Sequence, residues 1–337
     1  MDQALGWRLA TLAGAAVFIG LLYWTFEPVL RDSGSETLED LGLTSTPLPT
    51  AGPADPILVG AGDIARCGRQ EGEQTAQLLD QVVAGGVETV VFTAGDNAYE
   101  SGTFQEYEQC YGPSWGRHKD RTRPVLGNHE YELGSADGYF EYYGAIAGDP
   151  EEGYNSYDLG AWHIIVLNSS DHCRAVSCDA DSSQLQWLLA DLAEHSNFCM
   201  LAMWHAPLFT TGLEGGSARY IRPFWEVLYD NGADVIVNGH EHSYERFAPQ
   251  TPDGIQEPIY GIRQFVVGTG GDSLNAFANS PAPNSEVRND ATHGVLRLTL
   301  HPATYDWEFI PIAGQEFRDA GSGECHKAPP PLSATRP

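Results

Sequence analysis

Apolar residues along the chain fall into two patterns that predict different elements. Short runs rich in β-branched and aromatic residues predict strands. They lie at 57–60, 89–93, 157–159, 162–167, 198–203, 235–237, 265–267, 295–300 and 305–310. Three other stretches carry apolar residues every three or four positions and predict helices at 72–83, 181–193 and 221–229. This order, in which strands and helices alternate before successive antiparallel strands, predicts a four-layer α/β/β/α sandwich of two mixed sheets flanked by helices.

Residues 1–30 contain an uncharged stretch at 9–26 with aromatic residues near both of its ends. As a helix, the segment from Trp7 to Trp24 would span about 26 Å, which is close to the hydrocarbon thickness of a membrane. The stretch is long and no small-residue cleavage site precedes Glu27, so a retained signal anchor is favoured over a cleaved signal peptide. Both interpretations place the rest of the chain outside the cytosol, anchored to the membrane or secreted.

Composition sets the other boundaries. Residues 31–55 are rich in Ser, Thr, Pro and acidic residues without hydrophobic periodicity, which predicts a flexible stalk. Residues 316–337 include three successive prolines and predict a Pro-rich tail. One catalytic domain is therefore expected at 56–315, a length that single sandwich domains reach. A hydrophobic content of 42% is enough for a sizeable core.

The formal net charge of −28 restricts the partners of the protein. Nucleic-acid binding is not expected, because affinity for a polyanion depends largely on Lys and Arg, and Lys119 and Lys327 are the only lysines. A small phosphorylated substrate remains compatible, since bound di- or trivalent cations dominate the local field of a site. The acidity itself is interpreted as favouring solubility or a saline habitat. The sequence does not indicate an oligomeric state.

Five short polar segments follow the apolar runs. In chain order they are Gly62-Asp63-Ile64-Ala65, Gly95-Asp96-Asn97-Ala98-Tyr99, Gly127-Asn128-His129-Glu130, Trp204-His205 and Gly239-His240-Glu241-His242. They supply carboxylates, a carboxamide and imidazoles, which are ligands that metal ions accept in proteins. Because the segments lie just past the expected strands, they belong to the edge where α/β sheets place their ligand crevices. Together they predict a metal site.

The order and spacing of these segments resemble the metallophosphoesterase (calcineurin-like) superfamily and, within it, the purple acid phosphatases. The resemblance covers residues 57–312, and the Gly-Asp-x-x-Tyr, Asn-His and Gly-His-x-His blocks are matched in full. Two departures occur. The first block ends in Ala65 where the family usually has Gly, and the fourth begins with Ala202 where the family usually has Val. Neither change affects a ligand position.

The resemblance implies a centre of two metal ions in which the two-oxygen carboxylate of Asp96 bridges the ions. The other implied ligands are Asp63, Tyr99 and His242 for the first ion, and Asn128, His205 and His240 for the second. A phenolate from Tyr99 favours Fe(III) at the first site, while the second site suits Fe(II), Zn(II) or Mn(II). Such a centre clamps the attacking and leaving oxygens of an in-line phosphoryl displacement and supplies hydroxide as the nucleophile.

Each of these residues has a simpler explanation when taken alone. An Asp after Gly at a strand end, such as Asp63, is often a turn former or a helix cap. Tyr99 alone is explained by packing, and His205 alone by a hydrogen-bonded place in the core. Independent turns would not supply a complete ligand set in this order, so the joint metal interpretation is preferred. The other histidines have no motif context and are expected to be structural: His118, His163, His172, His195, His293, His301 and His326.

His129 is the candidate catalytic residue, because it directly follows Asn128 and is a suitable group to orient phosphate or protonate the leaving alkoxide. Family members commonly have a further His after the fourth block, but residues 206–220 contain none. The alternatives for a second proton donor are Glu130, Glu241 and Tyr244. Arg246, close to the last block, is either a phosphate contact or a surface salt bridge.

Six cysteines lie beyond the N-terminal stretch, and an even number in an exported domain favours disulfides. The two closest cysteines share a polar loop, which predicts a local bridge, and two others each follow a metal-ligand segment. The expected pairs are Cys173–Cys178, Cys67–Cys110 and Cys199–Cys325. A buried free thiol is an equally compatible interpretation of Cys199, because this residue belongs to an apolar strand.

The leading function hypothesis is phosphomonoester hydrolysis of the acid phosphatase type on a small phosphorylated substrate. The alternative within enzymes is a phosphodiesterase or nucleotidase that uses the same two metal ions. A non-catalytic binding protein with a degenerate site is a third class. The complete ligand set disfavours this class, because a pseudoenzyme is expected to have lost ligands.

Overall fold

The structure is a computed structural model that describes residues 54–213 and 217–328. The predicted signal segment, nearly all of the predicted stalk and the end of the predicted tail lie outside the described residues, so they stay predictions. None of the helices in the described part has the length and apolar character needed to traverse a bilayer.

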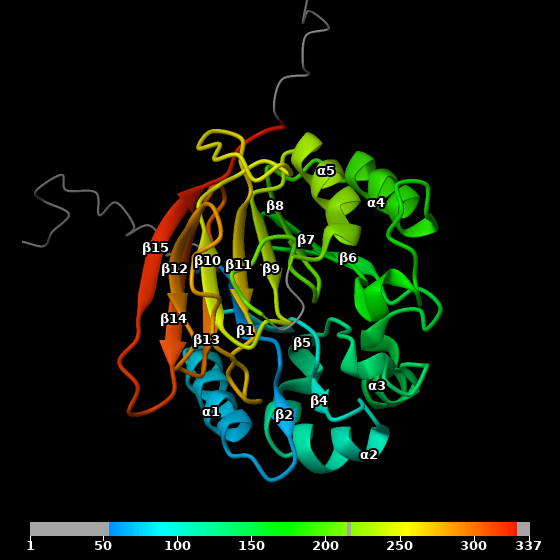
Figure 1. The fold of residues 1–337 in the computed structure, drawn as a ribbon, viewed down its shortest axis with the longest axis vertical. Helices are drawn as coiled ribbons and strands as arrows, with labels where there is room; N and C mark the ends of the chain where they lie inside the picture. The colour runs from blue at the N-terminus through cyan, green and yellow to red at the C-terminus, as the bar shows by residue number, and fades with distance from the viewer. Residues whose placement is uncertain (1–53, 214–216, 329–337) are drawn as a thin grey trace, which may run out of the picture. The chain divides into compact units, whose positions relative to one another are not determined.

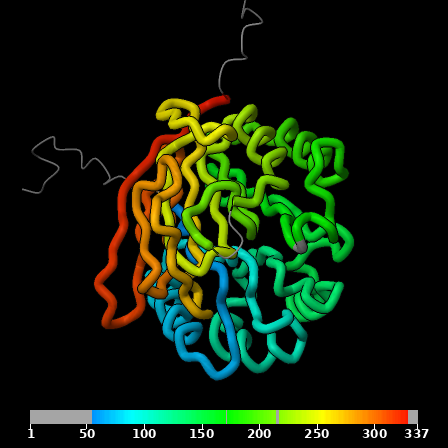
Figure 2. The backbone as a smooth tube through the Cα atoms, viewed as in Figure 1, coloured from blue at the N-terminus to red at the C-terminus, as the bar shows by residue number. Residues whose placement is uncertain are grey.

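The first of two large sheets has six strands in the order β15-β14-β13-β1-β3-β5. Their bounds are Asp319–Glu324 for β15, Thr304–Pro311 for β14, Gly294–Leu300 for β13, Ile57–Ala61 for β1, Thr89–Thr93 for β3 and Thr122–Arg123 for β5. β1, β3 and β5 are parallel, while β13, β14 and β15 pair antiparallel. The first and last parts of the domain therefore meet in one sheet, as the blue and orange segments of the tube show (Figure 2).

The second large sheet has seven strands in the order β12-β10-β11-β9-β8-β7-β6. Their bounds are Ser285–Asn289 for β12, Tyr244–Phe247 for β10, Arg263–Val267 for β11, Val235–Asn238 for β9, Cys199–Met203 for β8, Trp162–Val166 for β7 and Asn155–Leu159 for β6. β7, β8, β9 and β11 are parallel, and β6, β10 and β12 are antiparallel to their neighbours. A small parallel pair joins β2 (Ala65–Arg66) to β4 (Ala98–Tyr99).

Alternating side chains divide the domain into four layers. Ile164 and Val166 of β7 belong to the core shared with the six-stranded sheet, whereas Ile165 faces the opposite side. There it packs with α4 (Ser183–Glu194) and α5 (Arg222–Asp230), which lie side by side on the outer face (Figure 1). α1 (Glu71–Val83) packs on β3 and β13 of the other sheet. The predicted four-layer fold is confirmed.

Between β4 and β6 the chain forms α2 (Phe104–Glu106), α3 (Asp137–Tyr143) and several short 3-10 and π turns. The predicted helices, and the strands predicted at 157–159 and 162–167, are present within two residues of their expected ends. The N-cap of α4 is Ser182, whose hydroxyl accepts the N–H of Leu185 at 3.2 Å. The helix therefore begins two residues later than the predicted start at 181.

The predicted domain end at 315 is too early. β15 pairs with β14 through six residue pairs and extends the six-stranded sheet to Glu324. The predicted tail at 316–337 thus begins inside the folded domain. The apolar pattern does not reveal β15, because this strand pairs through its backbone and carries few apolar side chains.

All three predicted disulfides are present. The Cα–Cα distances are 4.9 Å for Cys67–Cys110, 5.5 Å for Cys173–Cys178 and 5.3 Å for Cys199–Cys325. Cys199 is therefore not a free thiol. The third bridge fixes the chain after β15 to β8, and removal of a native bridge of this kind typically costs about 2–5 kcal/mol.

Candidate metal centre

The structure brings all seven predicted ligands together at one edge of the two sheets. Each ligand except Tyr99, which ends β4, follows a parallel strand: Asp63 follows β1, Asp96 β3, Asn128 β5, His205 β8, and His240 and His242 β9. The turns are tight, with φ of 59° at Asp63, 50° at Asp96 and 70° at His240. Left-handed backbone at non-glycine residues costs energy and is concentrated at functional sites.

The first group of donor atoms surrounds the hydroxyl oxygen of Tyr99. This oxygen lies 3.0 Å from Oδ1 of Asp63, 3.2 Å from Oδ2 of Asp96 and 3.1 Å from Nε2 of His242. Nε2 of His242 is also 3.2 Å from Oδ1 of Asp63. These four side chains are nearly or fully buried, so their mutual contacts are shielded from water.

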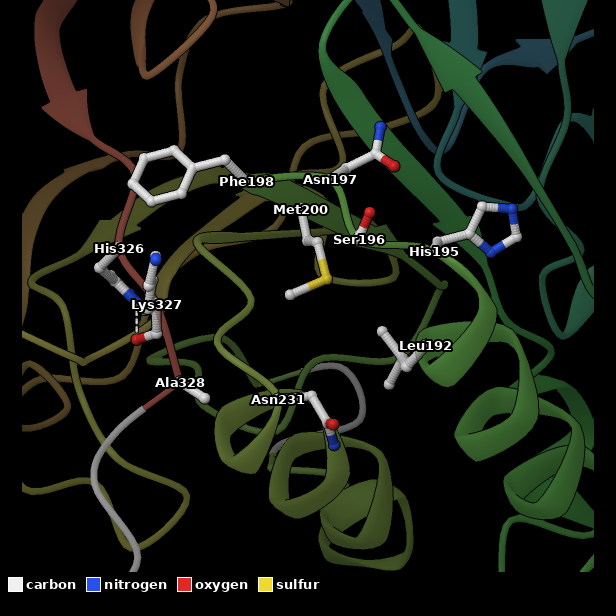
Figure 3. A pocket seen from close by; sticks show the side chains of 10 residues that line it. All are labelled: Leu192, His195, Ser196, Asn197, Phe198, Met200, Asn231, His326, Lys327 and Ala328. Atoms are coloured by element: carbon white, nitrogen blue, oxygen red, sulfur yellow. Dashed lines mark hydrogen bonds between the residues drawn. The ribbon is translucent and has the colours of Figure 1, made fainter.

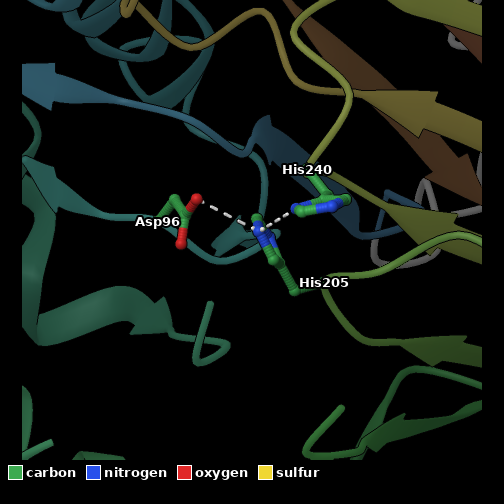
Figure 4. Close-up of side chains that lie close together, drawn as sticks. All are labelled: Asp96, His205 and His240. Atoms are coloured by element: carbon green, nitrogen blue, oxygen red, sulfur yellow. Dashed lines mark hydrogen bonds and ion pairs between the residues drawn. The ribbon is translucent and has the colours of Figure 1, made fainter. Parts of the chain in front are cut away.

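The second group surrounds Nε2 of His205. This nitrogen lies 3.1 Å from Oδ2 of Asp96, 3.0 Å from Oδ1 of Asn128 and 3.2 Å from Nδ1 of His240. Figure 4 shows Asp96 and His240 meeting His205 from opposite sides. Ligand atoms of these three residues all lie within 4.8 Å of one another, as a metal site requires.

One oxygen of Asp96 belongs to both groups. Oδ2 contacts Tyr99 on one side and His205 on the other, whereas Oδ1 accepts the backbone N–H of His129 at 2.9 Å. The sequence interpretation had used both oxygens for the bridge. The structure instead orients a single oxygen to both groups, because the other one is bonded to the third ligand segment.

The imidazole rings are oriented to offer lone pairs. Nδ1 of His205 donates to the carbonyl of Ala94 at 2.7 Å, and Nδ1 of His242 donates to the carbonyl of Ser273 at 2.6 Å. Each Nε2 is thereby left as an acceptor, which is the arrangement of metal-bound histidines. Carboxylate, phenol and imidazole donors converge in the first group, and carboxylate, carboxamide and imidazole donors converge in the second, without a Lys or Arg among them. This donor set fits two transition-metal ions.

Without metal ions, protons take the place of the cations. Burial disfavours the imidazolium of His205, but the charge and hydrogen bond of Asp96 outweigh this and raise the pKa to about 9. Burial also opposes protonation of His242, and the adjacent Asp63 nevertheless raises its pKa to about 10. The pKa of His240 falls to about 4, because the ring is buried and lies beside His205.

These shifts predict how metal removal couples to pH. An imidazolium with a raised folded-state pKa stabilises the fold fully below the unfolded value of about 6.5 and loses this contribution as the pH rises through the folded value. For His205 and His242 the windows end at about 9 and about 10. Chelator-treated protein is expected to lose thermal stability between about pH 7 and pH 10 more steeply than metal-loaded protein. Calorimetric Tm values that change in parallel for both forms would contradict this.

Glu130 holds two of the ligand segments in place. Its fully buried carboxylate accepts backbone N–H groups of Asp96 at 3.1 Å, Asn97 at 2.8 Å and Gly127 at 2.7 Å, and the hydroxyl of Tyr107 at 3.0 Å. A carboxylate occupied by four donors positions these loops. The structure therefore places Glu130 beneath the site and not where a proton donor would meet a substrate.

Two site residues were missed by the sequence interpretation. The guanidinium of Arg66 lies 4.8 Å from the ring centre of Tyr99 and binds both oxygens of Asp272, at 2.6 and 3.0 Å. Arg66 also pairs with Glu100, and the buried Asp272 lies 3.9 Å from Nδ1 of His242. Arg66 therefore helps to position the first group, directly through the ring of Tyr99 and indirectly through Asp272, which lies beside His242. The signal available in the sequence was the position of Arg66 directly after the first ligand segment.

His129 lies at the rim of the centre. Its half-buried ring is 4.5 Å from that of Tyr99, and Nε2 is 3.9 Å from Oδ2 of Asp96. Nδ1 is 2.5 Å from the carbonyl oxygen of Glu100, to which it donates. Burial opposes protonation of the ring, but the charge of Asp96 outweighs it and raises the pKa of His129. The side chain thus presents Nε2 toward the shared oxygen.

Two other candidates lie away from the centre. The hydroxyl of Tyr244 donates to Asp319 at 2.7 Å, and Nε of Arg246 donates to the same carboxylate at 2.7 Å. Arg246 also pairs with Glu286. Of the two interpretations of Arg246, the salt bridge is the one found, and it is buried instead of lying on the surface.

Fold and site together are of the metallophosphoesterase type. The family model described as calcineurin-like phosphoesterase matches residues 58–244, more than half of the chain. The chain therefore belongs to the calcineurin-like phosphoesterase family.

Similar proteins point to the purple acid phosphatases within this family. Purple acid phosphatase 22 of Arabidopsis thaliana is 30% identical over 154 residues, which are 43% of this chain and 34% of that protein. Purple acid phosphatase 21 of the same plant is 28% identical over 277 residues, 73% of this chain and 58% of that protein. The chain thus spans between about a third and three fifths of the length of these relatives.

Two solved structures share the fold. Purple acid phosphatase PPD1 from yellow lupin superposes with a TM-score of 0.66 at 17% identity and covers 84% of this chain and 58% of that chain. GAP50 of Plasmodium superposes with a TM-score of 0.63 at 11% identity, covering 82% and 90%. At these identities the likeness establishes the fold alone.

Proposed function

We propose that the protein is a dinuclear metal-dependent phosphomonoester hydrolase of the acid phosphatase type. The single observation that carries the proposal is the position of Asp96, whose Oδ2 faces both donor groups at 3.1 and 3.2 Å. A carboxylate oxygen at the junction of two such groups is suited to hold two ions close together. The resemblance to purple acid phosphatases in sequence supports the same function.

The residues divide between two ions. Asp63, Tyr99 and His242 would hold the first, Asn128, His205 and His240 the second, and Asp96 both. Such a pair of ions, when bound, neutralises charge on the phosphate oxygens and acidifies water.

The remaining steps belong to the chain itself. Glu130 fixes the loops that carry Asp96 and Asn128, so the donor atoms are held before a substrate arrives. Arg66 and Asp272 hold the ring of Tyr99 and the edge of His242. His129 donates a proton from Nε2 to the leaving alkoxide, since this nitrogen is the free one at the rim of the centre.

Fe(III) is proposed for the Tyr99 site, with Fe(II), Zn(II) or Mn(II) at the other. Burial and the adjacent carboxylates of Asp63 and Asp96 hold the pKa of Tyr99 well above 10, so its phenolate requires a strongly charged cation. The oxidised protein is expected to absorb visible light by charge transfer from this phenolate, and Tyr99→Phe is expected to remove the band while iron remains bound. An iron-loaded, oxidised wild type without visible absorption would contradict the ligand role.

The experiment that tests the proposed function compares p-nitrophenyl phosphate with bis(p-nitrophenyl) phosphate as a function of pH. A phosphomonoesterase is expected to hydrolyse the monoester with a much higher kcat/KM. Preference for the diester would favour the alternative of a phosphodiesterase acting with the same donor groups, and a monoester activity confined to nucleotides would favour a nucleotidase.

A non-catalytic binding protein is the alternative of a different class. GAP50, which shares the fold, is described as the anchor in the inner membrane complex of Plasmodium, and a fold does not by itself fix a function. Metal-loaded protein that hydrolyses neither ester would support this class. All seven donor positions carry a residue with a metal-binding side chain, which favours an enzyme over a binding protein with a degenerate site.

The protein is proposed to act outside the cytosol on small phosphorylated compounds. Three disulfides support an oxidising compartment. The uncharged stretch at 9–26 supports export and, if it is retained, attachment to a membrane.

A further inference from the structure

A second cluster of metal-ligating side chains lies at the amino end of β7, whereas the proposed metal centre lies beyond the carboxyl ends of the strands. Asp158 of β6, His163 of β7 and His195 at the end of α4 bring one ligand atom each within 4.8 Å of the others. The residues come from three separate elements, and none belongs to the seven ligands described above.

His163 is the fixed part of this cluster. Its ring is fully buried, and it pairs across the strands with Asp158, whose Oδ1 lies 2.9 Å from Nδ1. On the other side Nε2 lies 2.7 Å from Oδ2 of Asp191. Asp191 is buried in turn, and its Oδ1 accepts the hydroxyl of Ser156 at 2.6 Å. A carboxylate behind an imidazole is the arrangement that orients histidine ligands toward a metal ion.

His195 completes the cluster from the solvent side. Its Nδ1 donates to the carbonyl of Asp191 at 2.8 Å, which leaves Nε2 as an acceptor. The ring stacks on that of His163 with centroids 4.0 Å apart and planes 17° apart. His195 also borders a cavity of about 340 Å³ formed with residues such as Leu192 and Met200, and Figure 3 shows its ring pointing away from that cavity.

We propose that Asp158, His163 and His195 bind a divalent transition-metal ion of the Zn(II) class, separate from the catalytic centre. Two imidazoles and one carboxylate suit Zn(II), Co(II) or Ni(II), whereas Ca(II) and Mg(II) prefer sites built of oxygen. Zinc ligands at about 2.1 Å in a tetrahedral site lie about 3.4 Å from each other. The side chains of Asp158 and His195 are 53% and 33% exposed, so they can adjust to this spacing while His163 stays in place. The ring of His195 would turn out of its stack on His163, because the in-plane lone pairs of two parallel rings do not meet at one ion.

In the absence of an ion, a proton fills the same role. Burial opposes the imidazolium of His163, but its hydrogen bonds to Asp191 and Asp158 raise its pKa. An ion would replace the proton on Nδ1 and keep the bond from Nε2 to Asp191. Binding would join β6, β7 and the end of α4, and thereby stabilise the folded state by an amount that grows with the logarithm of the free ion concentration above Kd.

The test uses protein whose catalytic centre is already loaded, titrated with Co(II) as a spectroscopic probe. Wild type is expected to take up one additional Co(II) per chain, with visible d–d absorption. His195→Ala and Asp158→Asn are expected to bind it at least about 10-fold more weakly. Hydrolysis of p-nitrophenyl phosphate should stay unchanged in both variants. Zn(II) should raise the Tm of wild type and should raise that of the two variants by less.

His301→Ala is the matched control. His301 is likewise partly exposed between two carboxylates, with Nδ1 2.6 Å from Asp55 and Nε2 3.1 Å from Asp306. This variant should bind the additional Co(II) as wild type does. The proposal is overturned if wild type takes up no further ion, if uptake is undiminished in His195→Ala and Asp158→Asn, or if His301→Ala loses it equally.

Discussion

Asp96→Ala is expected to lose metal from both donor groups and to reduce hydrolysis of p-nitrophenyl phosphate by roughly 10³-fold or more. Within the contacts described for the two donor groups, Oδ2 of Asp96 is the one atom shared by both, because it contacts Tyr99 in the first group and His205 in the second. The ions are expected to contribute several kcal/mol of transition-state stabilisation, and each ~1.4 kcal/mol is a factor of ten in rate. Elemental analysis and steady-state kinetics on the purified variant measure the two effects.

Asp96→Asn is the matched variant, because it preserves the shape and the acceptor for the N–H of His129. It should fold with a near-native circular dichroism spectrum and still lose metal, since the anionic oxygen is gone. Full metal content in both variants would show that Asp96 does not join the groups.

His129→Ala is expected to lower kcat by roughly 10²- to 10⁴-fold, the usual contribution of a positioned general acid. Metal content should stay unchanged, because His129 is not among the donor groups. The loss should be largest for alkyl phosphates, whose alkoxides leave poorly, and smaller for p-nitrophenyl phosphate. Kinetics on the two substrates, with the metal content of the same samples, measure this.

His118→Ala serves as the control, since His118 also pairs with a carboxylate, Asp80 at 2.7 Å, but lies outside the site. It should retain wild-type kcat on both substrates. Equal losses in His129→Ala on the two substrates would point to phosphate positioning, and an unaffected kcat would remove His129 from the mechanism.

The position of the metal ligands past the strand ends was predictable, because the sequence signals that mark it are local. Asp63 and Asp96 each come directly after a short apolar run, and parallel strands place their carboxyl ends together. The sequence therefore predicted which segments meet. It did not predict that one oxygen of Asp96 faces both groups, because this depends on the N–H of His129 occupying the other oxygen.

Strands with few apolar residues were missed. Glu245 and Arg246 interrupt the apolar pattern of β10, although both side chains are buried. The carboxylate of Glu245 is satisfied inside the fold, where it accepts the N–H of Thr211 at 2.7 Å. In β15 the glycines are needed because a Cβ on Gly321 would lie 2.4 Å from the ring of Trp307. The local hydrophobicity of a segment does not show which distant residues its side chains will contact.

Pairs of residues far apart in the sequence were missed for the same reason. Arg66 and Asp272 are 206 residues apart, and only the fold brings them together beside Tyr99. His163 and His195 were expected to be structural, because neither belongs to a motif. Their stacked rings and shared carboxylate, Asp191, became visible only after β7 and α4 were placed.

The measurement that tests the central claim most directly is the number of metal ions per chain that restores hydrolysis of p-nitrophenyl phosphate. It is best made in the His195→Ala background, so that ions are counted at the catalytic centre alone. Metal-free protein titrated with Fe(III) and then Zn(II) should regain full activity at about two ions per chain, together with the visible absorption of the Tyr99 site. Full activity at one ion per chain, or without any, would contradict the dinuclear account.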